Sequence, residues 1–362
     1  MPYQLIAAPL SLYSGKVRGY LRWKNVAFTE ILSTAEVYKS IILPRVGWPV
    51  VPVLITPDDT IVQDSSDIID YLEKCEPGPS VYPKTPIQKL VTLIMELFGD
   101  EWLLIPAMHY RWTYNEDFAY QEFGNASAPE LPKEQRFELG KNLASRFKGS
   151  LPFLGITPKT APAIEKTYKT FLRAFNKHLA SHDFLLGSRP GIGDYGLLGP
   201  LYAHNYRDPA SGEMMERIAP GVADWCRRAH APQEALSGEF LADDEVPETL
   251  LPILQMFAGE QIPILVDTLA DLQKWAKDNP GTKELPRIIG FHKYRIDDVE
   301  EDRAVLPFSL WMLQRVLDHL KSLSGNERQQ AEDFLTRIGA QELLQMQVIP
   351  HLKHENFKLV RE

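Results

Sequence analysis

The stretch Val51-Pro52-Val53-Leu54-Ile55 decides how the first part of this 362-residue chain folds. Its apolar run predicts a strand, although a proline lacks the N–H group that a central ladder requires. Spacing alone favours a trans proline at the start of that strand. The alternative is a cis proline in the turn that leads into it. A cis Pro52 would turn the backbone N–H and C=O of Val51 outward, where both groups could pair with an extended peptide.

The segments around this stretch alternate between the periodicities of strands and helices. A turn-rich sequence around Pro57 links the stretch to a second short apolar run, which predicts a hairpin. Helices between the early strands imply parallel pairing, and the hairpin implies an antiparallel edge. The order β-α-β-α-β-β-α is that of a thioredoxin-like α/β domain, with strands at residues 3–8, 27–32, 51–55 and 60–62 and helices at residues 14–23, 35–42 and 65–72.

Asp64 and Ser65 open the helix that follows the hairpin. Either residue could simply cap the helix, because Asp and Ser are preferred at N-caps. The free N–H groups and the dipole of the same helix end could also hold a ligand carboxylate. Asp64 could meanwhile accept a hydrogen bond from a ligand ammonium. A short zwitterionic peptide would suit such a site.

The loop Ser11-Leu12-Tyr13-Ser14 joins the first strand to the first helix, where open α/β sheets place their ligands. A hydroxyl at Ser11 could donate a hydrogen bond to a thiolate, and the helix N-terminus would lower the pKa of that thiol. The alternative is that Ser11 or Ser14 only caps the helix. The loop by itself favours neither alternative.

The rest of the chain is predicted to be helical. Pro and Gly are concentrated in a linker, and helical periodicity dominates beyond it. The net charge of −9 argues against binding a phosphate backbone, and two distant cysteines, Cys75 and Cys226, are typical of reduced thiols in a cytosolic protein. No apolar run is expected to span a membrane. The predicted parts are a first domain at residues 1–76, the linker at 77–88, a helical domain at 89–231 and a mostly helical extension at 232–362.

Taken together, these motifs resemble the glutathione transferase superfamily. Its members carry a Ser, Tyr or Cys after the first strand, a cis-proline in a VPVL segment, and the pattern acid-Ser-x-x-Ile-x-x-Tyr-Leu. The segment Asp64-Ser65-Ser66-Asp67-Ile68-Ile69-Asp70-Tyr71-Leu72 fits that pattern at every fixed position. Ser11 stands where serine-type members place their activating hydroxyl, ahead of Lys16-Val17-Arg18.

The resemblance continues into the helical domain and covers roughly residues 1–230. Family members carry a Ser/Thr-x-x-Asp capping box, which Gly191-Ile192-Gly193-Asp194 resembles. Gly191 replaces the hydroxyl residue, so half of the reciprocal bonding is expected to be missing. Glycine is tolerated at an N-cap, and the loss should be about a few tenths of a kcal/mol. The extension from residue 232 onward lies outside the common pattern.

The resemblance implies a cytosolic, homodimeric glutathione transferase with a thioredoxin-like glutathione-binding domain, an all-helical second domain and no metal. Ser11 would stabilise the glutathione thiolate for attack on an electrophilic, partly apolar co-substrate. The residues expected to hold glutathione are Val51, Pro52, Asp64 and Ser65, with Lys16, Arg18 and Arg45 supplementing the anion site. The residues expected at the co-substrate site are Trp102, His109, Tyr110, Arg111 and Trp112, although an aromatic core stripe would explain each of them equally well.

The type of reaction stays open at this point. Serine-type relatives include conjugating enzymes, isomerases, dehalogenases and ether-cleaving enzymes. Because position 11 is not a cysteine, disulfide exchange through a protein thiolate is disfavoured. A catalytically silent binding protein of the same fold is the alternative, favoured by the long extension and opposed by the intact pocket motifs. No nucleic-acid or membrane partner is expected.

Overall fold

A computed structural model describes residues 2–362 of the protein. Packing divides the chain into two compact units, each assembled from three separate segments. Unit 1 comprises the residues up to Val81 together with Ala107–Ser150 and Tyr195–Gly238, and unit 2 comprises Tyr82–Pro106, Leu151–Asp194 and Glu239–Glu362. The boundaries expected after residues 76, 88 and 231 stay a prediction, because these units group segments by packing and not by continuity along the chain.

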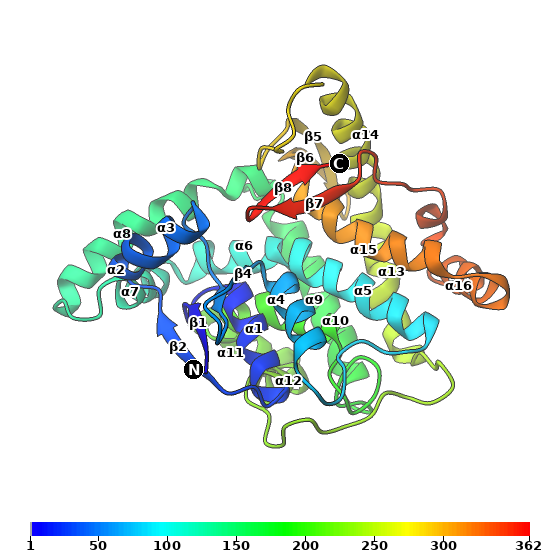
Figure 1. The fold of residues 1–362 in the computed structure, drawn as a ribbon, viewed down its shortest axis with the longest axis horizontal. Helices are drawn as coiled ribbons and strands as arrows, with labels where there is room; N and C mark the ends of the chain where they lie inside the picture. Colours follow the sequence, from blue (N-terminus) through cyan, green and yellow to red (C-terminus); the bar gives the residue numbers. More distant parts are fainter. Residues whose placement is uncertain (1) are drawn as a thin grey trace. The chain divides into compact units, whose positions relative to one another are not determined.

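Unit 1 contains a four-stranded mixed sheet in the order β2-β1-β3-β4 (Figure 1). Strand β1 is parallel to β2, while β3 runs antiparallel to both β1 and β4. The predicted α/β order and its thioredoxin-like topology are therefore confirmed. The strands are β1 (Tyr3–Ala7), β2 (Phe28–Leu32), β3 (Val53–Ile55) and β4 (Ile61–Gln63).

Three helices of the sheet region begin at residues that the sequence marks as caps. Ser11, Thr34 and Asp64 each accept a hydrogen bond from a backbone N–H in the first turn of the helix that follows. The helices in and after the sheet region are α1 (Leu12–Trp23), α2 (Ala35–Val37), η1 (Tyr38–Ile42), α3 (Leu43–Val46) and α4 (Ser65–Cys75). The later helices of unit 1 are α7 (Glu116–Ser127), α8 (Lys133–Gly149), η3 (Leu201–Tyr206), α11 (Pro209–Ile218) and α12 (Pro220–His230), together with most of α6 (Leu104–Tyr114) and α10 (Ile192–Pro200), whose first residues belong to unit 2.

Helix α1 packs closely against the helical part of unit 1 at Gly19. A Cβ atom at this position would lie 2.7 Å from Leu198 Cδ2 and 2.9 Å from the Ala229 carbonyl oxygen. A larger residue would therefore push α1 outward. Since Ser11 caps the start of α1, the close packing at Gly19 helps to fix the position of the candidate catalytic hydroxyl.

Unit 2 is mostly helical, as expected for the extension, and it also contains two β-hairpins. Gln314 on α15 holds the C-terminal hairpin, because its side-chain amide donates to the Leu352 carbonyl and accepts from the Leu352 N–H, both at 2.8 Å. The hairpins are β5 (Phe291–Ile296) with β6 (Val299–Ala304) and β7 (Leu352–Glu355) with β8 (Lys358–Arg361). The helices are α5 (Pro86–Glu101), η2 (Leu151–Leu154), α9 (Ala161–His178), η4 (Glu248–Leu250), α13 (Leu251–Met256), η5 (Phe257–Gln261), α14 (Ile262–Asp278), α15 (Phe308–Ser322), α16 (Gly325–Ile338) and η6 (Gln341–Leu344).

The capping box at the start of α10 is half formed, as expected. The Asp194 carboxylate accepts from the Gly191 N–H at 2.9 Å, which is the half of the box that the sequence retains. The Asp194 N–H, which the hydroxyl of a Ser or Thr cap would have served, donates instead to the Gly191 carbonyl at 3.0 Å. The Gly193 N–H in the same turn donates to the Thr92 hydroxyl of α5 at 2.9 Å.

One helical run corrects the expectation that no apolar segment reaches membrane-spanning length. The run Glu248–Asp278 meets that length with a mean hydropathy of 1.4 in its most apolar window. However, 44% of that window is buried inside the protein, and core helices of soluble proteins share these properties.

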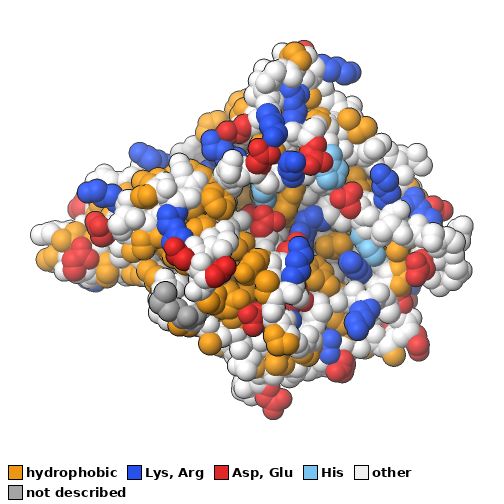
Figure 2. All heavy atoms as spheres, viewed as in Figure 1, with side chains coloured by type: hydrophobic (Ala, Val, Ile, Leu, Met, Phe, Trp, Pro, Cys, Tyr) orange, Lys and Arg blue, Asp and Glu red, His pale blue; other side chains and the backbone are white. Residues whose placement is uncertain are grey.

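Acidic and basic side chains are interspersed over the face seen in Figure 2, as is usual for a folded surface.

Candidate functional site

One row of paired strand residues brings three predicted site segments to the same edge of the sheet in unit 1. Ile6 of β1 pairs with Val53 of β3, and Val53 pairs in turn with Gln63 of β4. Because β3 is antiparallel to both neighbours, its start lies beside the ends of β1 and β4. The segments that flank these strand ends therefore lie at the same edge of the sheet: the loop after β1 that leads to Ser11, Val51 and Pro52 before β3, and Asp64 and Ser65 after β4.

Ser11 combines a capping contact with a hydroxyl proton that can serve a second partner. Its Oγ accepts a hydrogen bond from the Ser14 N–H at 3.3 Å, and its own N–H donates to the Ala8 carbonyl at 3.2 Å. Accepting uses a lone pair of the hydroxyl and leaves its O–H to donate. Ser14 is fully buried and accepts from the Ala8 N–H. Capping and donation are therefore compatible at Ser11, whereas Ser14 is a structural residue of the loop.

The peptide bond between Val51 and Pro52 is cis. Strand β3 begins at Val53, so the backbone groups of Val51 lie ahead of the ladder. Pro52 is buried and Val51 is partly exposed. The trans proline that spacing alone favours is therefore wrong, while pairing of Val51 with an extended peptide stays a prediction.

Asp64 holds the N-terminus of α4 in an unusual backbone conformation. Its carboxylate accepts from the Ser66 N–H at 2.8 Å, which is the contact expected of an N-cap. Its φ is 80° and its ψ is 136°, a region that costs a non-glycine residue on the order of 1–3 kcal/mol and is frequent at ligand-binding positions. Ser65, the first residue of the helix, is 4% exposed, and its role toward a ligand stays a prediction.

The three cations expected near the anion site lie in different places. Lys16 is fully buried, and its Nζ donates to Ser66 Oγ at 2.9 Å, which brings it to the first turn of α4. Arg18 forms a two-point ion pair with Glu30 of β2, with contacts of 2.7 and 2.6 Å. Arg45 pairs with Asp59 in the β3–β4 turn, at the opposite end of the hairpin from Val51. Lys16 alone of the three is brought to the α4 N-terminus by these contacts.

The residues expected at the co-substrate site are all buried. Four of them belong to α6 in unit 1, and Trp102 belongs to unit 2. Arg111 forms an ion pair with Asp208 and also donates to the carbonyls of Leu10 and Ala203. Their roles toward a co-substrate stay a prediction, and in this structure the exposed fractions are 3% for Trp102, 1% for His109, 4% for Tyr110, 1% for Arg111 and 4% for Trp112.

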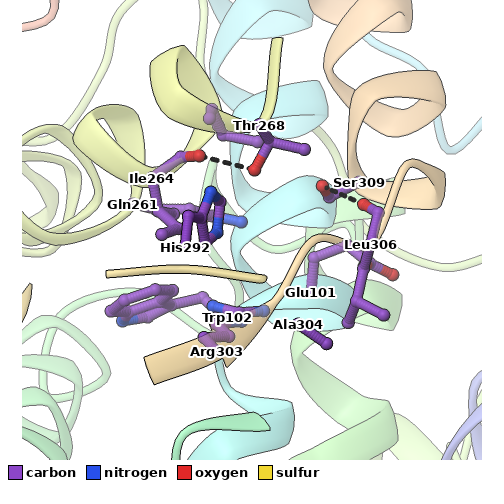
Figure 3. A pocket seen from close by; sticks show the side chains of 11 residues that line it. Glu101, Trp102, Gln261, Ile264, Thr268, His292, Arg303, Ala304, Leu306 and Ser309 are labelled. Atoms are coloured by element: carbon purple, nitrogen blue, oxygen red, sulfur yellow. Dashed lines mark hydrogen bonds between the residues drawn. The ribbon is translucent and has the colours of Figure 1, made fainter. Parts of the chain in front are cut away.

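Trp102 borders a small polar cavity within unit 2 (Figure 3). Its indole N–H donates to Glu260 Oε2 at 2.8 Å, and its ring lies under the guanidinium of Arg303. Burial raises the pKa of Glu260 to about 7, although the bond from Trp102 opposes this shift. The cavity has room for about one water molecule. No sequence motif marks Glu260 or Arg303, because both lie in the extension from residue 232 onward, which has no recognisable motif.

Solved structures similar to this chain include several glutathione transferases. A glutathione S-transferase from Rhodospirillum rubrum F11 is 16% identical, with a TM-score of 0.42, over 68% of this chain and 96% of that one. The beta-etherase LigF from Sphingobium sp. strain SYK-6 is 19% identical, with a TM-score of 0.45, over 64% and 96%. A glutathione S-transferase from Methylobacterium radiotolerans, in complex with glutathione sulfonate, is 21% identical, with a TM-score of 0.40, over 68% and 100%.

Two sequence families match parts of this chain. No curated protein matches this chain. Residues 5–80 match the family described as glutathione S-transferase, N-terminal domain, and this range holds the strands and turns of the edge described above. Residues 158–228 match the glutathione S-transferase C-terminal domain. The regions 5–80 and 158–228 of this chain therefore belong to the glutathione S-transferase superfamily.

Proposed function

We propose that this protein is a glutathione transferase that activates the glutathione thiol for attack on an electrophilic, partly apolar co-substrate. The observation that carries the proposal is the gathering of Ser11, Val51 and Asp64 at one edge of the sheet. They supply a hydroxyl donor, a backbone clamp and a helix N-terminus with a carboxylate. A short zwitterionic peptide that carries a thiol needs each of these groups.

Binding would begin with the two ends of the tripeptide. The backbone N–H and C=O of Val51 would pair with the extended ligand backbone. The N–H groups at the start of α4 would hold a ligand carboxylate, while the Asp64 carboxylate would accept from the ligand ammonium. With both ends fixed, the cysteinyl thiol would come to lie beside Ser11.

Activation would follow from a hydrogen bond and a local field. The Ser11 hydroxyl would donate to the sulfur, and the N-terminus of α1 would add a positive potential, so the thiol would lose its proton to solvent more readily. The thiolate would then use an electron pair to form a C–S bond with the co-substrate. In a substitution the leaving group departs with the electrons of the broken bond, and in an addition the adjacent carbanion takes up a proton.

The test is the variant Ser11→Ala in a conjugation assay with glutathione and a chlorodinitrobenzene. We expect kcat/KM to fall about 10²-fold or more, because the donor to the thiolate is lost. The pKa of the enzyme-bound thiol, followed by the ultraviolet absorbance of the thiolate, should rise toward that of free glutathione. An unchanged rate and thiol pKa would contradict the proposal.

Loss of a helix cap is a separate effect of Ser11→Ala and needs its own control. Thr34 caps α2 through the same kind of contact, from the Val37 N–H to its hydroxyl at 3.3 Å. Thr34→Ala removes a cap without removing the proposed donor. It should leave the thiol pKa unchanged, while Ser11→Thr should restore much of the activity because threonine keeps the hydroxyl.

Asp64→Asn separates ligand binding from capping at α4. Asparagine caps helices about as well as aspartate, so the stability should change little. The charge-assisted bond to the ligand ammonium would be lost, and the Kd for glutathione should rise about tenfold. Calorimetric titration of glutathione measures the Kd, and thermal unfolding measures the stability. An unchanged Kd would exclude Asp64 from the ligand site.

The reaction class and the setting are also part of the proposal. Conjugation, isomerisation, dehalogenation and ether cleavage all use the same thiolate, and a panel of such substrates would distinguish them. We propose a cytosolic homodimer, as the family resemblance implies. Failure of immobilised glutathione to retain the protein would instead favour a catalytically silent binding protein.

A further inference from the structure

Two arginines from the helical part of unit 1 hold the backbone carbonyls directly before Ser11. Arg111 Nη1 on α6 donates to the Leu10 carbonyl at 3.0 Å. Arg207 is the residue after η3, and its Nη1 donates to the Pro9 carbonyl at 2.8 Å. Consecutive peptide groups of the loop are thus fixed by side chains that lie far from it in the sequence.

The anchor at Arg111 is rigid. Its Nε and Nη2 donate to the two carboxylate oxygens of Asp208 at 2.7 and 2.6 Å, and Nη2 also donates to the Ala203 carbonyl at 2.9 Å. The side chains of Arg111 and Asp208 are 1% and 0% exposed. Because the guanidinium is planar and its donors are fixed relative to one another, it cannot shift without breaking several of these bonds.

The anchor at Arg207 is similar but less deeply buried. Its Nη2 donates to Glu122 Oε2 on α7, and its side chain is 22% exposed. Both arginines therefore have an acidic partner, which compensates their charge. The main effect of the two arginines on the loop is therefore to fix the positions of its carbonyls, and their long-range electrostatic effect on the site is smaller.

We propose that Arg111, held by Asp208, and Arg207 are positioning residues for Ser11. This inference rests on the proposed function, since it concerns the hydroxyl that would activate glutathione. Leu10 immediately precedes Ser11, so a fixed Leu10 carbonyl fixes the peptide plane from which the Ser11 backbone starts. A displacement of about 1 Å at a reacting group can cost up to 10²-fold in rate, so the placement of this carbonyl matters.

The test compares Arg207→Gln with Arg227→Gln in the full-length protein. Arg227 is the matched control, since it is an exposed arginine of unit 1 that pairs with Glu216 and Asp224. For Arg207→Gln we expect kcat/KM to fall about tenfold, mainly through kcat, with a higher pKa of the bound glutathione thiol. Arg227→Gln should match the wild type in both measurements. A merely structural role for Arg207 would lower stability without changing the thiol pKa.

Asp208→Asn tests the deeper anchor, with Asp208→Glu as the conservative variant. Circular dichroism shows first whether each variant is folded. If Asp208→Asn does not fold, Arg207→Gln still tests the proposal. Asp208→Asn should raise the thiol pKa, and Asp208→Glu should restore part of the change. If Ser11→Ala abolishes activation but neither Arg207→Gln nor Asp208→Asn changes the thiol pKa, the positioning role is overturned and the proposed function stands. If Ser11→Ala itself changes nothing, both proposals fail together.

Discussion

Arg111 in unit 1 and Arg303 in unit 2 are both buried guanidinium groups, yet their surroundings differ. Arg111 donates to Asp208 and to the carbonyls of Leu10 and Ala203. Arg303 is 5% exposed and lies over the rings of Trp102 and Tyr294, 5.6 and 5.8 Å from their centroids. Among residues 2–362, nothing accepts a hydrogen bond from its Nη1. Burial lowers the pKa of this guanidinium.

The difference shows that burial by itself does not reveal what a charged residue does. The hydrogen bonds of Arg111 are directional, so they fix the positions of particular backbone atoms beside the candidate site. The contacts of Arg303 with ring faces fix no particular backbone atom, because the quadrupole of each ring attracts the cation over its face without a hydrogen bond to a backbone group. We therefore expect the two arginines to respond very differently to removal of their charge.

The largest effect is expected for Arg111→Met. Removing one partner of a buried ion pair leaves Asp208 charged and unpaired, which costs about 3–5 kcal/mol. Urea unfolding measures this loss of stability. The double variant Arg111→Met/Asp208→Leu removes the stranded charge and should recover part of it. If Arg111→Met were as stable as the wild type, the two arginines would not differ in the way described.

An intermediate effect is expected for Glu260→Gln, and it depends on pH. The pKa of Glu260 is raised to about 7, so its neutral form favours the folded state. That contribution is complete below the unfolded pKa and is lost as the pH rises through about 7. At about pH 8 the variant should be more stable than the wild type by on the order of 1–2 kcal/mol, after allowing for the partial exposure of Glu260.

The same variant at low pH supplies the control for this prediction. At about pH 4.5 the carboxyl is protonated in the folded state and about half protonated in the unfolded state, so glutamine should change the free energy of unfolding by only about 0.5 kcal/mol. Urea unfolding at both pH values measures the difference. A gap between variant and wild type that stays constant with pH would show that Glu260 does not titrate in this range.

The smallest effect is expected for Arg303→Met. The loss of ring contacts is offset by removing a buried charge that lacks an ion-pair partner within 4 Å among the described residues, so the stability should stay within about 1 kcal/mol of the wild type. Thermal unfolding of this variant beside Arg111→Met measures the contrast directly. A loss as large as that of Arg111→Met would show that the cavity in unit 2 stabilises Arg303 as strongly as Asp208 stabilises Arg111.

Much of the sheet region could be predicted from the sequence because its determinants are local. The short apolar run before Pro9 placed a strand at residues 3–8, and β1 spans Tyr3–Ala7. The caps at Ser11 and Asp64 follow from residue type and position. The hairpin β7–β8 was not predicted, and its contacts include distant ones, such as those from the Gln314 side chain to Leu352 and from the Leu285 N–H to the Leu359 carbonyl.

The candidate site was predictable only as far as its contacts are local. Val51 and Asp64 were singled out because short strands fix their spacing, and their role toward glutathione stays a prediction. The bond from Arg111 to Leu10 joins residues about a hundred positions apart, and no sequence pattern reports such a pair. Arg111 was singled out because it falls where the family resemblance places the co-substrate site, and its ion pair with Asp208 emerged only from the fold.

The β3–β4 turn has a practical consequence for engineering the protein. It lies at the end of the hairpin opposite Val51 and Asp64. Hydrogen bonds within the turn stabilise it, including the one from the Thr56 N–H to the Thr60 carbonyl at 3.0 Å. Pro57, Asp58 and Asp59 at its tip are exposed. A fluorescent reporter or an affinity tag inserted at this tip would therefore sit away from the edge where glutathione is proposed to bind, and would leave that edge accessible for assays on a labelled protein.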